Sequence, residues 1–303
     1  MSDFEQKIIK HLKDRDVSDP TIKLYLFQLR QINGGEINDL NNFEDIPKVI
    51  DFLKKFKINT VRTKLISVIA MLKAFDKKDL QDEYSEIVAN INKETNLISN
   101  EKTDKQKANW VTKEEIKDIW TSFDEVIKTF INKKQISEKQ YNILLQFVVL
   151  SLYTLTNPRR NADYMNMVVI KKVTDGLPQN LNYLDLQKRK FYFNNYKTSK
   201  TYKQQIEDIP SDLFNVLKIY LKYKPTDSNF LLVDYEGKNL KHVNSITLIL
   251  NKIFHKKVGS SLLRNIFLSE KFSGLQKQLD ELGDTAESMG TSKASALGVY
   301  IKK

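Results

Sequence analysis

The segment Tyr153–Tyr164 has the sequence YTLTNPRRNADY. It directly follows ILLQFVVLSL (Ile143–Leu152), an apolar run that is typical of a buried helix. Two adjacent arginines therefore stand, after a proline, where a buried helix ends, although arginine is seldom buried without an anionic partner. One carboxylate, Asp163, is close in sequence and cannot neutralise both. Either the arginines lie at the surface by accident, or one guanidinium points inward and binds an anion that this chain does not supply.

The sequence before this segment predicts helices. In residues 1–98, apolar residues recur at helical spacing in four stretches, which indicates a small bundle of amphipathic helices. In the third stretch, INTVRTKLISVIAMLKAF, Val61 and Leu65 lie on the apolar face, whereas Arg62 and Lys64 lie off it. Residues 99–109, SNEKTDKQKAN, are almost wholly polar and have no apolar periodicity, which is typical of an interdomain linker.

After the linker the pattern is first helical and then changes. Thr112 and Glu115 form the T-x-x-E pattern of a capping box, and helices are expected at 113–132 and 137–155. Polar residues then alternate with aromatic or aliphatic ones, which predicts three short antiparallel strands, at 181–186, 190–195 and 203–209. Further helices are expected at about 211–223, 241–256, 260–272, 275–282 and 293–300. The predicted fold is mainly α with a small antiparallel β-sheet, in a helical domain over 1–98 and an α+β domain over 110–303.

Composition narrows the class of protein. A chain of 303 residues suggests two domains, and a formal net charge of +11 favours an acidic polymer, most commonly nucleic acid, as partner. The chain has no cysteine, and its three histidines have no metal-ligand spacing, so we expect no disulfide and no metal site. There is no GxxxxGK[ST] loop, and no cofactor is expected. Without an apolar run of transmembrane length or a leader, we expect a soluble, intracellular protein that has no membrane partner.

Four residues of the second domain form an ordered set. They are Arg160 with a carboxylate three residues later, Lys197 in NYKTSKTYK, Arg264 in GSSLLRNIF, and Tyr300 in MGTSKASALGVYIKK. In this order they resemble the tyrosine recombinase (phage integrase-like) family. The spacing of nine residues from Thr291 to Tyr300 matches the family's distance from a "GH" turn to its nucleophile. The segment PRRNADY looks most like that of recombinases from virophages and other mobile elements of large DNA viruses. The heavy use of lysine, asparagine and isoleucine, which AT-rich genomes produce, fits the same resemblance.

Two positions depart from the family's pattern. Ser261 stands where the family usually has histidine or lysine in H-x-x-R, and Thr291 stands where it usually has histidine or tryptophan. Serine and threonine can still donate a hydrogen bond to a phosphate oxygen. Neither is a cation or an effective acid or base near neutral pH, which puts in question how the attacking tyrosine loses its proton.

The resemblance implies a site-specific DNA recombinase or integrase. Tyr300 would attack a DNA phosphate and form a 3′-phosphotyrosyl intermediate, while Arg160 and Arg264 stabilise the phosphate and Lys197 protonates the leaving 5′ hydroxyl. It also implies a helical core-binding domain and a catalytic domain on opposite sides of double-stranded DNA. Strand exchange would take a homotetramer on two DNA sites, built from free monomers or dimers. Neither metal nor ATP would be needed.

Other basic residues are candidates for contacts with the DNA backbone. They are Lys200, Lys256, Lys257, Arg62 and Lys64. Two assignments stay open: Arg159 can replace Arg160 in the inward role, and Lys200 can replace Lys197. A viral protein of this kind would work in the cytoplasm, the nucleus or a viral factory, or be packaged in the virion.

Three other functions are compatible with the same residues. A type IB-like DNA topoisomerase would nick and reseal DNA by the same chemistry. A DNA-binding protein of the same fold would have lost catalysis through Ser261 and Thr291. A metal-dependent integrase with three carboxylates is the least favoured, and it would require Mg²⁺ or Mn²⁺.

Overall fold

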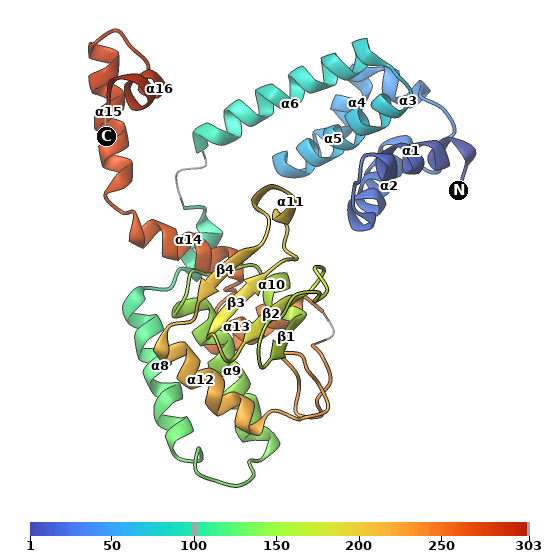
Figure 1. The fold of residues 1–303 in the computed structure, drawn as a ribbon. Coiled ribbons are helices and arrows are strands. Elements are labelled where there is room, and N and C mark those ends of the chain that lie inside the picture. Colours follow the sequence, from blue (N-terminus) through green and yellow to red (C-terminus); the bar gives the residue numbers. More distant parts are fainter. Residues whose placement is uncertain (99–101, 241, 302–303) are drawn as a thin grey trace. The chain divides into compact units, whose positions relative to one another are not determined.

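The computed structural model describes residues 1–98, 102–240 and 242–301. The chain divides into two compact units, Met1–Lys102 and Thr103–Lys303, and Figure 1 shows the elements of each. This division falls inside the predicted linker 99–109. Residues 99–101 of that linker lie outside the described residues, while Asp104–Asn109 form helix α7, which begins with a capping box at Thr103. Polar composition alone did not indicate this short helix.

The first unit is a bundle of helices around one apolar core. Its helices are α1 (Asp3–Asp14), α2 (Asp19–Asn33), α3 (Asn41–Glu44), α4 (Ile46–Leu53), α5 (Ile58–Ala74) and α6 (Lys78–Ile98). The apolar stripes predicted from the sequence face inward: Leu29, Phe43 and Met71, for example, are fully buried in one cluster. Helix α2 ends before Gly34, the C-cap residue, which has a φ of 80°. Glycine adopts this left-handed conformation without steric cost.

An ion pair between a partly exposed arginine and a buried carboxylate joins α1 to α2. Arg30 donates from Nε and Nη2 to the two oxygens of Glu5, at 2.7 and 2.6 Å, and the backbone N–H of Ile37 donates to the same carboxylate at 3.3 Å. The Glu5 side chain is fully buried. The hydrogen bond from Arg30 lowers the pKa of Glu5, because it stabilises the charged form.

Lys64 does not lie off the apolar face of its helix, as the sequence pattern predicted. It is fully buried in α5, where its ammonium donates to Oε1 of Gln31 at 2.5 Å and lies 4.5 Å from the centre of the Phe56 ring. Burial lowers the pKa of Lys64. The prediction failed because a long lysine stem can pack among apolar side chains when its charged end finds an acceptor and an aromatic face. Its neighbour Arg62 is exposed, as expected.

The second unit is mainly helical with a small sheet. Its larger helices are α8 (Lys113–Lys128), α9 (Glu138–Thr154), α12 (Ser211–Tyr223), α13 (Asn244–Phe254), α14 (Ser260–Lys271) and α15 (Leu275–Ser288). Short turns form α7, α10 (Asn161–Met165), α11 (Ser199–Tyr202), α16 (Lys293–Ser295) and the π-helical η1 (Ala296–Tyr300). The apolar run of α9 is almost wholly buried, which confirms the helix predicted before the arginines. The capping box predicted at Thr112 is also present.

The sheet has four strands rather than three. They follow the order β1 (Met167–Ile170), β2 (Asn182–Asp185), β3 (Lys190–Phe193) and β4 (Gln205–Asp208). The pairs β2–β3 and β3–β4 are antiparallel as predicted, but β1 runs parallel to β2, so the sheet is mixed. The expectation of a wholly antiparallel sheet was therefore wrong. The sequence MVVI is too short to show a period, and its pairing with the distant Asn182–Asp185 and with Phe230 is non-local.

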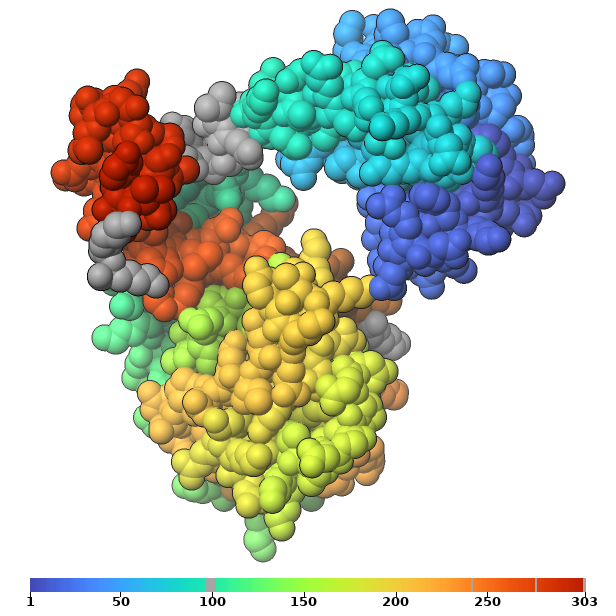
Figure 2. All heavy atoms as spheres, turned by 45° about the horizontal axis from the view of Figure 1, so that its top comes forward, coloured from blue at the N-terminus to red at the C-terminus, as the bar shows by residue number. Residues whose placement is uncertain are grey.

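The residues after α14 lie outside the main core. No described residue beyond Ile266 belongs to the buried core of this unit. Among the described residues from Leu275 to Ile301, the buried apolar ones are Ala286 and Ala296. Larger apolar side chains there are exposed: Leu275, Met289, Leu297, Val299 and Ile301. Figure 2 shows this C-terminal segment in red. Among the described helices, none is both long and apolar enough to cross a membrane.

Candidate anion-binding site

The two arginines lie in a connection between two helices. After α9 ends, Pro158 cannot continue a helix because it lacks an N–H donor, and Arg160 takes an extended conformation as the N-cap of α10. The sharp change of backbone direction gives the two side chains different surroundings. Both side chains line one pocket, but only Arg159 also bonds to strand β4 of the sheet.

Arg159 is the inward-facing arginine. Its Nε donates to Oδ2 of Asp163 at 3.0 Å, and its Nη1 donates to Glu207 at 2.7 Å and to Gln205 at 2.9 Å. The guanidinium carbon lies 3.7 Å from the centre of the Phe193 ring, and the side chain is 11% exposed. Both carboxylates near the site are thus bound to Arg159. Burial raises the pKa of Asp163, while Arg159 opposes that shift.

A pocket of about 250 Å³ brings Arg160 and Arg264 together. The residues that line it are Asn157, Pro158, Arg159, Arg160, Asp163, Tyr196, Thr198, Tyr202, Gln205, Glu207 and Arg264. Within the described part of the chain, neither Arg160 nor Arg264 forms an ion pair with a carboxylate. Two positive charges without carboxylate partners at one pocket favour a bound anion.

Arg264 projects from the first turns of α14. Its Nη2 donates to Oγ of Ser261 at 3.3 Å, and its buried Nε has no hydrogen-bond partner. A buried donor without a partner is costly, and an anion in the pocket is the kind of group that satisfies such a donor. Ser261 therefore touches the guanidinium itself in this structure.

A hydrogen-bond network supports the helices around Arg264. The hydroxyl of Tyr153 donates to Oδ1 of Asn161 at 2.8 Å, and Nδ2 of Asn161 donates to the carbonyl of Val243 and to Oγ1 of Thr247. This network joins the end of α9 to α10 and α13. Burial raises the pKa of Tyr153 strongly, and Arg264 opposes the shift. The Tyr153 hydroxyl is thus a neutral structural group.

The β3–β4 connection forms another wall of the pocket. Its residues Tyr196, Thr198 and Tyr202 line the pocket, and the exposed Lys197 lies between the first two. The tip, which contains α11, projects from the surface of the second unit (Figures 1 and 2). The sequence had placed Lys197 and Lys200 on this turn, but it gave no role to Tyr196, Thr198 or Tyr202. The signal available was their position on the same turn as the candidate lysines.

Two predicted residues lie elsewhere in this structure. Tyr300 is in η1, where its side chain is 62% exposed, and it is not among the residues that line the pocket. Thr291 lies in the turn after α15, where its N–H donates to the carbonyl of Ala286. The structure thus brings together the two arginines and the hairpin but leaves the C-terminal tyrosine apart from them.

The remaining basic candidates differ in their surroundings. Lys256 donates to the carbonyl of Trp110 at 3.2 Å and to Glu115 at 3.0 Å, so its charge is already paired within the unit. Lys257 is exposed, and Lys200 is exposed on α11. Lys64 is buried, as described above, and cannot contact a phosphate from that position.

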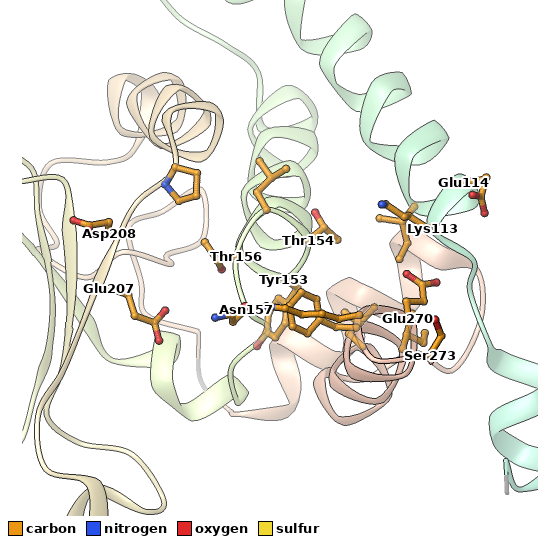
Figure 3. Close-up of a pocket in the computed structure, with 17 residues that line it drawn as sticks. Lys113, Glu114, Tyr153, Thr154, Thr156, Asn157, Glu207, Asp208, Glu270 and Ser273 are labelled. Carbon is orange, nitrogen blue, oxygen red and sulfur yellow. The ribbon is translucent and has the colours of Figure 1, made fainter. Parts of the chain in front are cut away.

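A groove of about 1080 Å³ with a partly apolar lining adjoins the pocket, and Asn157 and Glu207 line both. Charged residues also line it: Lys113, Glu114, Glu207, Asp208, Glu270 and Lys271. Figure 3 shows Thr154 at the end of α9 and Thr156 just after it, between Glu207 and Asp208 of β4 on one side and Glu270 and Ser273 on the other. The apolar part of the groove consists of Ile116, Leu155, Leu263, Ile266 and Phe267. Its edge is formed by Lys271 and Ser273, where the C-terminal segment begins.

Comparison with known proteins supplies no assignment. No protein-family model matches this chain, and no curated protein sequence matches it. Across the described residues, no group of three or more histidine, cysteine, aspartate or glutamate side chains is placed to hold a metal ion. The function is therefore argued from the geometry and charge of the site.

Proposed function

We propose that this protein binds double-stranded DNA and cuts and rejoins it through a covalent bond between Tyr300 and a DNA 3′ phosphate. The observation that carries the proposal is that Arg160 and Arg264, far apart in the sequence, line one pocket without carboxylate partners. The motif order from Arg160 to Tyr300, which resembles that of tyrosine recombinases, supports it. The net charge of +11 also favours a polyanionic partner.

The two guanidinium groups suit the charge that develops during phosphodiester cleavage. Attack on phosphorus adds negative charge to the non-bridging oxygens, and fixed donors at these oxygens lower the barrier. Arginine keeps its charge at every physiological pH and presents several donors in a fixed plane. Arg159 serves this arrangement indirectly: it pairs with Asp163 and Glu207, which also line the pocket, and so offsets their negative charge there.

Tyr300 must reach the pocket for this chemistry to occur. We propose that the α15–η1 segment docks into this partly apolar groove of its own chain. The groove shares Asn157 and Glu207 with the arginine pocket, and its edge at Ser273 is where the segment starts. Docking would bury exposed apolar side chains of the segment, such as Leu297 and Val299, and this burial is favourable.

Lys197 is the proposed acid for the leaving 5′ oxygen. It is exposed on the hairpin, and its neighbours Tyr196 and Thr198 line the pocket. A protonated amine on a projecting turn can approach a bound backbone and donate its proton. Strand exchange between two duplexes would take four copies of the chain, two on each DNA site.

The test is covalent capture of DNA. The protein is incubated with a pool of nicked duplexes of random sequence, in which loss of the short strand traps the intermediate, and is then analysed on a denaturing gel. Wild type should form a protein–DNA adduct in the presence of EDTA, and Tyr300→Phe should form none. An adduct that persists in Tyr300→Phe overturns the assignment of the nucleophile. Activity that requires Mg²⁺ overturns the mechanism.

A second candidate is a DNA-binding protein that does not cleave. The exposed position of Tyr300 outside the pocket favours it. In that case no adduct forms with any substrate, while DNA binding still depends on Arg160 and Arg264. A topoisomerase, the third candidate, would relax supercoiled plasmid and yield no recombinant product.

A further inference from the structure

Tyr202 is the exposed phenol at the arginine pocket. It ends α11, its side chain is 64% exposed, and it lines the same pocket as Arg160 and Arg264. Within the described part of the chain, its hydroxyl has no hydrogen-bond partner. Tyr196, the other hairpin tyrosine in the pocket, is mostly buried, and its hydroxyl is already bonded.

The backbone beside Tyr202 is held in a rare conformation. Lys203 has φ 57° and ψ −159°, a region that is almost restricted to glycine. Two bonds hold it there: the hydroxyl of Tyr196 donates to the carbonyl of Lys203 at 2.7 Å, and the N–H of Lys203 donates to the carbonyl of Ser199 at 2.8 Å. Backbone strain of this kind persists only where the surroundings impose it, and it gathers at functional sites. Here it fixes the end of α11, and with it the position of Tyr202.

We propose that the hydroxyl of Tyr202 donates a hydrogen bond to the phosphate that Arg160 and Arg264 hold. That the phosphate belongs to DNA rests on the proposed function. A tyrosine is neutral near pH 7, and its O–H forms short, charge-assisted bonds to anionic oxygen. The two guanidinium groups supply charge from α10 and α14, and Tyr202 supplies a donor from the hairpin side.

The variant Tyr202→Phe removes the hydroxyl and keeps the ring. Its matched control is Tyr235→Phe, which removes a phenol that is 44% exposed, packs against Tyr141 and does not line the pocket. Arg264→Ala tests whether the pocket is the phosphate site at all. Inorganic phosphate is the probe, and its affinity for the full-length chain is measured by isothermal titration calorimetry at constant ionic strength.

Phosphate affinity should fall about tenfold in Tyr202→Phe, the value of one hydrogen bond to a charged group, and stay unchanged in Tyr235→Phe. If Arg264→Ala weakens binding and Tyr202→Phe does not, the Tyr202 proposal is wrong and the proposed function is untouched. If Tyr202→Phe weakens binding but wild type forms no DNA adduct, Tyr202 stands and the cleavage function is wrong. If Arg264→Ala has no effect, both are overturned. An adduct that maps to Tyr202 by mass spectrometry overturns its role as a donor.

Discussion

Nε of Arg159 lies 3.0 Å from Oδ2 of Asp163, so it is the first of the two adjacent arginines that holds the nearby carboxylate. Arg160, one residue later, lines the pocket and forms no ion pair with any described residue. Both arginines line the pocket, but only Arg159 is paired with carboxylates of the protein. The sequence had left open which of the two faces inward, and the structure separates their roles.

This separation predicts different effects on stability. Arg159→Ala leaves the carboxylate of Asp163, which is 3% exposed, without its partner and should destabilise the second unit by roughly 3 kcal/mol. Arg160→Ala removes no ion pair and should change the free energy of unfolding by less than about 0.5 kcal/mol. Both tryptophans, Trp110 and Trp120, lie in the second unit, so their fluorescence in urea reports on that unit alone. Equal effects of the two variants on the fluorescence transition would contradict the assignment.

Acid should reduce the stability that Glu5 gives to the first unit. Because Arg30 lowers the pKa of Glu5 in the folded chain, this stabilisation is present above the usual carboxyl pKa and is lost as pH falls through the lowered value. Arg30→Ala should cost about 2 kcal/mol near neutral pH, less than for a fully buried pair because Arg30 is partly exposed. Between about pH 7 and about pH 3 the difference from wild type should shrink.

The measurement separates the two units. Far-ultraviolet circular dichroism follows helices in both, whereas tryptophan fluorescence follows the second alone. Arg30→Ala should shift the dichroism transition without moving the fluorescence transition. A loss of stability that is the same at both pH values would show that the Glu5 charge is not its cause.

Docking of the C-terminal segment on its own chain can be tested by mixing two inactive variants. Arg264→Ala lacks a pocket arginine and Tyr300→Phe lacks the nucleophile, so neither alone should form a DNA adduct. If each Tyr300 serves its own pocket, an equimolar mixture stays inactive. An adduct on the Arg264→Ala chain in the mixture would show that Tyr300 of one copy reacts in the intact pocket of another copy.

Lys197 should matter only when the leaving oxygen needs a proton. Lys197→Ala should slow adduct formation about 100-fold on ordinary DNA, which is within the usual range for loss of a general acid. A substrate with sulfur in place of the bridging 5′ oxygen has a leaving group that needs no proton, and it should restore the rate. Lys200→Ala, on the same turn, is the control. If the sulfur substrate rescues Lys200→Ala and not Lys197→Ala, the acid is Lys200.

Local patterns in the sequence predicted most of the longer helices, although they missed α1 (Asp3–Asp14). The T-x-x-E pattern at Thr112 forms both capping bonds, and the apolar run after Ser137 forms a buried helix over Glu138–Thr154. These features depend on neighbours within a turn or two, so the sequence displays them directly. The order of Arg160, the hairpin and Arg264 also predicted which segments share a pocket.

Features that depend on distant partners were missed. Strand β1 exists because Met167–Ile170 meets Asn182–Asp185, and Lys64 is buried because Gln31 supplies an acceptor. Neither partner can be read from a local period. Tyr202 was missed although its turn was a candidate, because nothing near it in the sequence shows which side chains of the turn line the pocket.

The strained backbone of Lys203 carries a consequence for directed evolution of this protein. Selection for heat resistance alone should favour Lys203→Gly, because glycine occupies φ 57°, ψ −159° without steric conflict. The same substitution loosens the turn that holds Tyr202. A thermostability screen and a DNA-processing screen should therefore select different residues at position 203, and that divergence would distinguish a residue kept for function from one kept for folding.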